Sequence, residues 1–176
     1  MGKYPDIGIL DAIYRLSFGT GLKVPREKIY KHMARKNNLD RVWFSKKVYY
    51  LKKRGFLQYG PTQELILTKS GVKHLDLCRL ENLKLEQKSG DGRWRVIIFD
   101  IPEKQRSARD LLRAKLNEFR CYQLQKSVYL TLYECEKEIR EISTILGLSK
   151  NVHVITAESI GSVESEVRKR LKPFKS

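Results

Sequence analysis

In the first half of the chain, apolar residues recur every three or four positions, which is the spacing of one face of an α-helix. This spacing predicts three helices, and each is bounded by residues that start or stop helices. The first opens at Pro5 and Asp6 and stops at 19–21, the second opens at Pro25 and stops at 37–38, and the third is capped by Asp40 and stops at Gly55. Two short strands, 56–59 and 64–67, follow around a turn-forming segment, and a fourth helix begins near Thr68.

Three helices followed by a two-stranded hairpin form the order of a winged helix-turn-helix. Residues 52–57 and 67–71 resemble the wing region of many bacterial regulators. The resemblance implies an N-terminal DNA-binding domain, for which we expect residues 1–86.

The second half predicts a different arrangement. Strands are expected at 94–99, 122–125, 128–132 and 152–156, and helices at 104–119 and 134–146. The order β-α-β-β-α-β is that of a ferredoxin-like domain, whose sheet carries both helices on one face. Residues 87–92 have turn composition without an apolar anchor, so they are the predicted linker to a second domain over 93–176. The expected fold class is therefore α+β.

The charge of the chain indicates a polyanionic partner. Lys and Arg total 36 against 20 Asp and Glu, which gives a formal net charge of +16. Residues 23–54 alone hold 12 basic and 2 acidic side chains, on the second and third predicted helices. Nucleic acid is the leading candidate, because a surplus of this size otherwise opposes compactness by self-repulsion.

Other features exclude several classes of protein. Cys78, Cys121 and Cys135 lack the spacing of a zinc site or a disulfide framework, and the three histidines are scattered. We therefore expect no intrinsic zinc. No apolar run approaches the roughly 20 residues needed to span a bilayer, and no signal peptide is evident. A cytoplasmic protein without a membrane partner is expected.

The third predicted helix is the candidate DNA-reading element. Turning Phe44, Val48 and Leu51 inward leaves an outward face that includes Val42. On this face and beside it, the residues predicted to bind double-stranded DNA are Lys28, Arg41, Lys46, Lys47, Tyr49, Tyr50, Lys53 and Arg54. Lysines can contact phosphates or guanine edges, and tyrosines can pack on thymine methyl groups. The alternative is a solvated helix whose tyrosines cover the core.

In the second half, an apolar run ends on Asp100 and Pro102, and a basic helix follows. That helix carries Arg106, Arg109 and Arg113. These arginines are candidates for phosphate contacts, and the alternative is pairing with Glu103 and Asp110 as ordinary surface charges.

Three segments carry a resemblance to known families: 94–103, the helix with Arg106, Arg109 and Leu116, and 124–129. They look like the small CRISPR-associated protein Cas-two, and still more like the central domain of PaaX-type transcriptional repressors, in which a winged helix precedes this domain. Arg120 departs from the pattern, because the family usually has glycine there. The chain also ends at Ser176 without the further C-terminal domain of PaaX regulators, so sensing of an acyl-coenzyme A is not carried over.

The Cas-two resemblance implies a role for Asp100, since the matching aspartates of two subunits are assigned to a shared divalent metal for phosphodiester cleavage. Magnesium is the metal this would imply. The alternative is that Asp100 caps the following helix or pairs with Arg106 or Arg109. A metal-dependent endonuclease is therefore one hypothesis, although we expect a binding protein rather than an enzyme.

Two binding functions remain. The first is a homodimeric, sequence-specific transcriptional repressor, in which the ferredoxin-like half joins two chains and the winged helices occupy two half-sites. The alternative is a Cas-two-like protein of CRISPR adaptation that acts as a scaffold between integrase subunits.

Overall fold

The computed structural model describes residues 7–17, 21–35, 39–85 and 91–171. The chain divides into two compact units, Met1–Asn82 and Leu83–Ser176. Most of the predicted linker, 87–90, lies outside the described residues, as do Pro5, Asp6, 19–20 and 37–38 from the predicted helix boundaries. Both units mix helices with antiparallel sheets, so the α+β class is confirmed.

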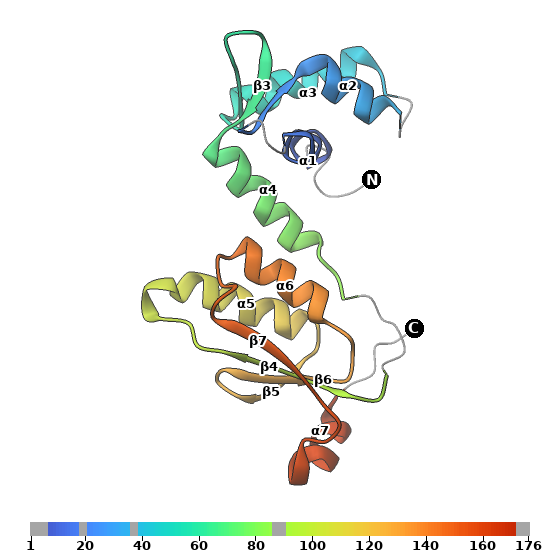
Figure 1. Ribbon diagram of the computed structural model, residues 1–176, viewed down its shortest axis with the longest axis vertical. Helices are drawn as coiled ribbons and strands as arrows, with labels where there is room; N and C mark the ends of the chain where they lie inside the picture. The colour runs from blue at the N-terminus through green and yellow to red at the C-terminus, as the bar shows by residue number, and fades with distance from the viewer. Residues whose placement is uncertain (1–6, 18–20, 36–38, 86–90, 172–176) are drawn as a thin grey trace. The chain divides into compact units, whose positions relative to one another are not determined.

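The first unit has seven elements along its described residues: α1 (Ile7–Leu16), β1 (Lys23–Pro25), α2 (Arg26–Ala34), α3 (Arg41–Lys53), β2 (Leu57–Tyr59), β3 (Glu64–Leu67) and α4 (Lys69–Asn82). Its sheet has the strand order β1-β3-β2, with antiparallel neighbours (Figure 1). The three-residue strand β1 was not predicted from the sequence. It exists because β3 offers a pairing partner, with Val24 opposite Leu65 in a buried pair.

Local chemistry explains where these helices begin and end. Asp40 precedes α3, and its carboxylate accepts a hydrogen bond from the backbone N–H of Trp43 at 2.9 Å. Gly55 ends the helix region with φ +74°, a conformation that glycine adopts without steric cost. The Thr68 hydroxyl donates to the Gly55 carbonyl at 2.6 Å and accepts from the N–H of Gly71 at 3.0 Å. One threonine thus links the end of α3 to the start of α4.

Apolar faces of all four helices and three strands form the core of the first unit. Fully buried side chains come from α1, α3 and the strands, including Ile13, Phe44 and Leu65. Arg79 of α4 also donates a hydrogen bond to Asp11 of α1 at 2.5 Å. Packing and this ion pair together hold α4 against α1.

The second unit has nine elements along its described residues: β4 (Trp94–Phe99), the 3-10 turn η1 (Glu103–Gln105), α5 (Arg106–Glu118), β5 (Tyr122–Gln125), β6 (Val128–Thr131), α6 (Glu136–Ile145), β7 (Val152–Ala157), η2 (Gly161–Val163) and α7 (Glu164–Arg170). The sheet order is β5-β6-β4-β7, and all neighbours are antiparallel. Both α5 and α6 lie on one face of this sheet (Figure 1). This arrangement fits the expected ferredoxin-like order.

Register places the side chains of β4 on two faces. Ile97 and Phe99 are buried on the side of α5 and α6, whereas Val96 lies opposite Leu130 on one neighbour and Ile155 on the other. The end of this second face is covered by α7, whose Val167 packs with Trp94 and Leu130. Neither η2 nor α7 was predicted, because a seven-residue helix offers too little periodicity. Ile155 remains 49% exposed on the uncovered part of the sheet.

None of the helices among the described residues is long and apolar enough to cross a membrane.

Candidate nucleic-acid interface

A continuous stripe of exposed side chains runs along α3. It comprises Val42, Lys46, Tyr49 and Lys53, which we refer to as the α3 stripe. Their spacing of four, three and four residues keeps them on one side of the helix. Val42 is 58% exposed and Tyr49 is 68% exposed, which is unusual for large apolar side chains on a packed helix.

The opposite side of α3 fixes the direction of this stripe. Phe44, Val48 and Leu51 are buried in the core of the first unit, as the sequence predicted. The cap at the start of α3 also fixes the helix. Its backbone N–H groups, above all that of Trp43, donate hydrogen bonds to the Asp40 carboxylate, and these bonds lower the pKa of the Asp40 carboxyl. A charged carboxylate at a helix N-terminus is also favoured by the helix dipole. The stripe is therefore held on a well-anchored helix.

Within the stripe, the two lysines are available to a ligand. Lys46 and Lys53 are exposed, and neither forms an ion pair with any residue that the structure describes. Tyr49 stands between them, half a turn from the buried side of the helix. The stripe therefore alternates apolar and cationic groups along its length.

Arg41, at the start of α3, is held by the protein itself. Its guanidinium donates two hydrogen bonds to Glu27 of α2, at 2.9 and 3.3 Å, and lies 4.5 Å from the ring centre of Tyr30. The predicted DNA contact of Arg41 therefore competes with an internal carboxylate. Lys28 lies one residue from Glu27 and is exposed.

The other predicted residues flank the α3 stripe. Lys47 lies within 6.0 Å of the ring centres of Trp43 and Tyr50. Arg54 donates to the Tyr50 hydroxyl at 3.3 Å and lies over the Phe56 ring at 4.9 Å. Tyr50 is 44% exposed, so this group forms a cationic and aromatic border rather than a buried cluster.

In the second unit, Asp100 follows β4 directly and is exposed. Its backbone is fixed, because its N–H donates to the Asn151 carbonyl at 3.0 Å and its carbonyl accepts from the Asn151 side chain at 2.7 Å. Its carboxylate accepts no hydrogen bond from another described residue. Neither the predicted helix cap nor the predicted pairing with Arg106 or Arg109 is present.

A single Asp100 carboxylate does not make a metal site. Across the described ranges, no group of three or more His, Cys, Asp or Glu side chains is placed to hold a metal ion. The nearest acid in sequence, Glu103, pairs with Arg109 at 2.8 Å, and this contact lowers the pKa of the Glu103 carboxyl. One chain supplies one ligand, so the magnesium hypothesis requires Asp100 from two chains.

The three arginines of α5 behave differently from one another. Arg109 donates to Glu103 and to the Ile101 carbonyl, and Arg113 donates to the Lys126 carbonyl at 2.8 Å. Arg106 is 71% exposed and lies 3.8 Å from both Glu103 and Asp110. Arg109 thus braces the segment that follows β4, Arg113 braces the turn between β5 and β6, and Arg106 is the most accessible of the three.

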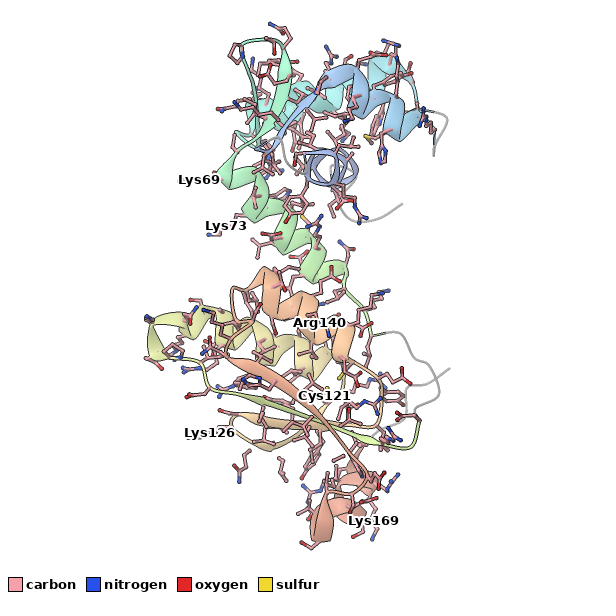
Figure 2. All side chains as sticks on the ribbon, in the orientation of Figure 1. Lys69, Lys73, Cys121, Lys126, Arg140 and Lys169 are labelled. Atoms are coloured by element: carbon pink, nitrogen blue, oxygen red, sulfur yellow. The ribbon has the colours of Figure 1, made fainter. Side chains whose placement is uncertain are left out.

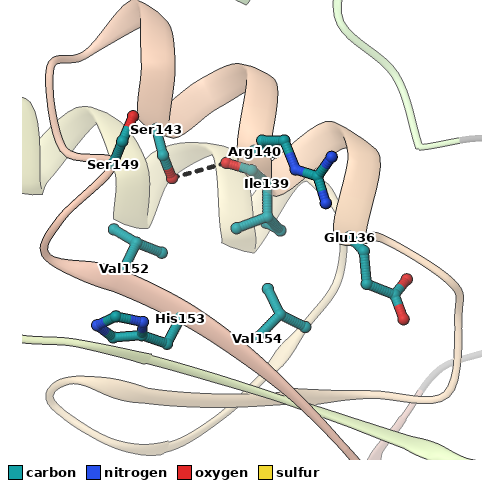
Figure 3. A pocket seen from close by; sticks show the side chains of 8 residues that line it. All are labelled: Glu136, Ile139, Arg140, Ser143, Ser149, Val152, His153 and Val154. Carbon is teal, nitrogen blue, oxygen red and sulfur yellow. Dashed lines mark hydrogen bonds between the residues drawn. The ribbon is translucent and has the colours of Figure 1, made fainter.

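A pocket of about 290 Å³ opens between α6 and β7 (Figure 3). Its lining residues are Glu136, Ile139, Arg140, Ser143, Ser149, Val152, His153 and Val154. Two of its polar side chains have partners in the same unit, since Ser143 donates to the Ile139 carbonyl at 2.7 Å and Glu136 accepts from Arg95 at 2.8 Å. Among the described residues, no hydrogen bond joins its carboxylate, Glu136, to its imidazole, His153.

Sequence reasoning missed two buried cations. Arg95, whose side chain is 4% exposed, binds Asp91 and Glu136, and its hydrogen bonds to Asp91 hold the pKa of that carboxyl down to about 2. Lys115 donates to Glu118 and to the Leu83 carbonyl. In the sequence, the only sign of either residue is a charged side chain at a position where the pattern of the strand or helix expects an inward-facing apolar one.

Comparison with known proteins gives one match. Residues 87–169 match the family model described as the PaaX protein central Cas2-like domain. No curated protein and no solved structure matches the chain. The match confirms the predicted resemblance of the second half, whereas the winged-helix interpretation of the first half stays a prediction. The second unit is therefore similar to the central domain of PaaX proteins, and this similarity indicates a regulator.

Proposed function

We propose that this protein is a sequence-specific, double-stranded-DNA-binding transcriptional repressor that acts as a homodimer, with its first unit as a winged helix-turn-helix. The observation that carries the proposal is the α3 stripe, in which lysines that form no ion pair with a described residue alternate with exposed apolar side chains. The similarity of residues 87–169 to a domain of PaaX proteins supports a regulatory role.

The size of α3 suits the major groove. Its 13 residues form a helix about 20 Å long. The major groove of B-DNA is wide enough to admit an α-helix. Lys46 and Lys53 would reach phosphates or guanine acceptors, and Val42 and Tyr49 would pack against thymine methyl groups. The hairpin of β2 and β3 would take the position of the wing.

Dimerisation would come from the second unit. Its sheet leaves Ile155 half exposed, and Ile98 and Val128 lie opposite one another in register on the same face without full burial. An apolar sheet face of this kind is usually covered by another surface. Two chains joined there would present two copies of α3 to an inverted repeat.

The test is a selection of bound duplexes from a random library, with the mass of the free protein measured in parallel by light scattering. We expect an inverted-repeat sequence and a dimer mass. A library that enriches only for duplex ends or bent shapes would refute sequence-specific reading. A monomer mass at micromolar concentration would refute the dimer.

A second candidate is favoured by the Cas2-like description of the matched domain. In this case the protein would be a scaffold between integrase subunits of CRISPR adaptation, with cleavage by paired Asp100 residues as an additional activity. The scaffold predicts a stable complex with an integrase encoded beside the gene, and a neighbourhood without one removes this candidate. Cleavage predicts a magnesium-dependent product that is lost in Asp100→Ala, and a product that persists in this variant refutes it.

A further inference from the structure

Arg41, the first residue of α3, is held in one orientation by two residues of α2. Its Nη2 and Nη1 atoms donate hydrogen bonds to the two carboxylate oxygens of Glu27, at 2.9 and 3.3 Å. The guanidinium also lies 4.5 Å from the ring centre of Tyr30. Exposed ion pairs usually contribute little, but a bidentate pair between arginine and a carboxylate is an exception because it fixes the plane of the guanidinium. Glu27 and Tyr30 together therefore decide where the guanidinium points.

Tyr30 is itself anchored to the core of the first unit. Its hydroxyl donates to the Leu39 carbonyl at 3.1 Å, and its ring meets the buried ring of Phe44 edge to face at 5.5 Å. A tyrosine fixed through both its hydroxyl and its ring is a stationary platform for the guanidinium. The orientation of Arg41 thus depends on packed residues and not on the surface pair alone.

The contact with Glu27 occupies only one edge of the guanidinium. An arginine has five N–H donors, and this contact takes one from each terminal nitrogen. Of the remaining three, the Nε–H and a neighbouring terminal N–H lie side by side and match the paired acceptors O6 and N7 of guanine. The Arg41 side chain is 67% exposed and lines a hollow of about 320 Å³ between α2 and α3. A base edge can therefore be reached while Glu27 stays bound.

The charge of the pair favours a base over a phosphate as the partner of Arg41. The guanidinium and the Glu27 carboxylate cancel each other, so together they attract the phosphate backbone weakly. What the pair retains is a fixed direction of its hydrogen-bond donors, and direction is what distinguishes one base pair from another. Val42, the next residue along the chain, begins the α3 stripe.

We propose that Glu27 is a positioning residue that holds Arg41 to read one guanine at the edge of the sequence contacted by α3, which rests on the proposed DNA-binding function. Glu27 itself would touch no DNA. Its carboxylate would add specificity by fixing the arginine and by lowering the attraction of the arginine to phosphates. Loss of the carboxylate should consequently have opposite effects on specificity and on non-specific affinity.

The test compares the full chain with Glu27→Gln, Arg41→Gln and the double variant. All are measured against the selected duplex, a series in which each base pair of the half-site is changed in turn, and an unrelated duplex, over a range of salt. The matched controls are Glu141→Gln and Arg140→Gln, which make the same changes of charge at exposed positions on α6 (Figure 2 labels Arg140). Both Glu27 and Arg41 are exposed, so the thermal midpoints should stay close to that of the parent.

The parent should discriminate at one G·C pair by about 5- to 150-fold, the range for a good bidentate contact. Arg41→Gln should abolish discrimination at that pair and leave the other positions unchanged. Glu27→Gln should weaken discrimination at the same pair, yet bind the unrelated duplex more tightly with a salt slope steeper by up to about 0.9, because the released arginine can meet a phosphate. The double variant should discriminate there no worse than Arg41→Gln, since both changes remove one contact. The controls should keep the parental base profile.

Three results would overturn the positioning role. The first is a Glu27→Gln variant that keeps the parental profile although Arg41→Gln changes it. The second is an Arg41→Gln variant that keeps discrimination at every pair. The third is an Arg41→Gln variant that weakens binding to all duplexes alike and reduces the slope by about 0.9, which would assign Arg41 to a phosphate. In each case a parent that still selects a sequence leaves the proposed function standing, whereas a parent that selects none refutes that function.

Discussion

Replacing Lys46 and Lys53 with alanine tests whether the α3 stripe meets DNA. Each lysine that neutralises a phosphate releases condensed counterions, so each lost contact should reduce the salt slope by about 0.9. The double variant should lose about 1.8 of the slope. Between 50 and 200 mM salt, this corresponds to about a tenfold smaller drop in affinity than the parent shows. Neither lysine has an ion-pair partner among the residues described, so no internal contact offsets the loss.

The assay is fluorescence anisotropy with a labelled duplex at five or more salt concentrations. Lys69→Ala/Lys73→Ala serves as the charge-matched control, since both lysines are exposed on α4. Thermal midpoints of all three proteins should agree closely, because exposed substitutions rarely change stability by more than about 0.5 kcal/mol. An unchanged slope in Lys46→Ala/Lys53→Ala, or an equal change in the control, would show that α3 is not at the DNA.

Three further predictions concern stability. Leu112→Ala in α5 removes a fully buried side chain from the second unit, so urea denaturation should show a loss of about 2–5 kcal/mol, and a loss below about 1 kcal/mol would contradict this packing. Gly71→Ala should destabilise by about 1–3 kcal/mol despite the better helix propensity of alanine, because its Cβ would collide with the Phe56 carbonyl; a stabilised variant refutes the close approach. The pKa of Asp91 is about 2 because Arg95 donates to it, so its contribution to stability is complete above about pH 4 and disappears as the pH falls toward 2. Asp91→Asn should therefore lower the thermal midpoint at pH 7 by an amount that shrinks below pH 4, and a constant difference across this range would exclude the linkage.

The contrast between α3 and α5 shows how far a sequence pattern reaches. On α3, helical spacing placed Phe44, Val48 and Leu51 inward and the lysines outward, and the structure agrees. On α5, Leu112 and Leu116 are buried at helical spacing, but such spacing does not say what the arginines of the helix bind. Arg113 reaches the Lys126 carbonyl in the turn between β5 and β6, 13 residues away. Loop conformation decided this contact, and no periodicity encodes it.

The sequence by itself determined the local elements of this protein, because the repeat of an α-helix or a β-strand follows from the geometry of the backbone. The strand 94–99 and the strand 122–125 have the predicted bounds for this reason. Tertiary structure alone decided which partners distant residues find. Arg41 donates a hydrogen bond to Glu27, and Arg95 donates one to Glu136. It also decided that the Asp100 carboxylate has no side-chain partner among the residues that the structure describes. A long charged side chain can reach several acids, and only the packed positions of the elements select among them.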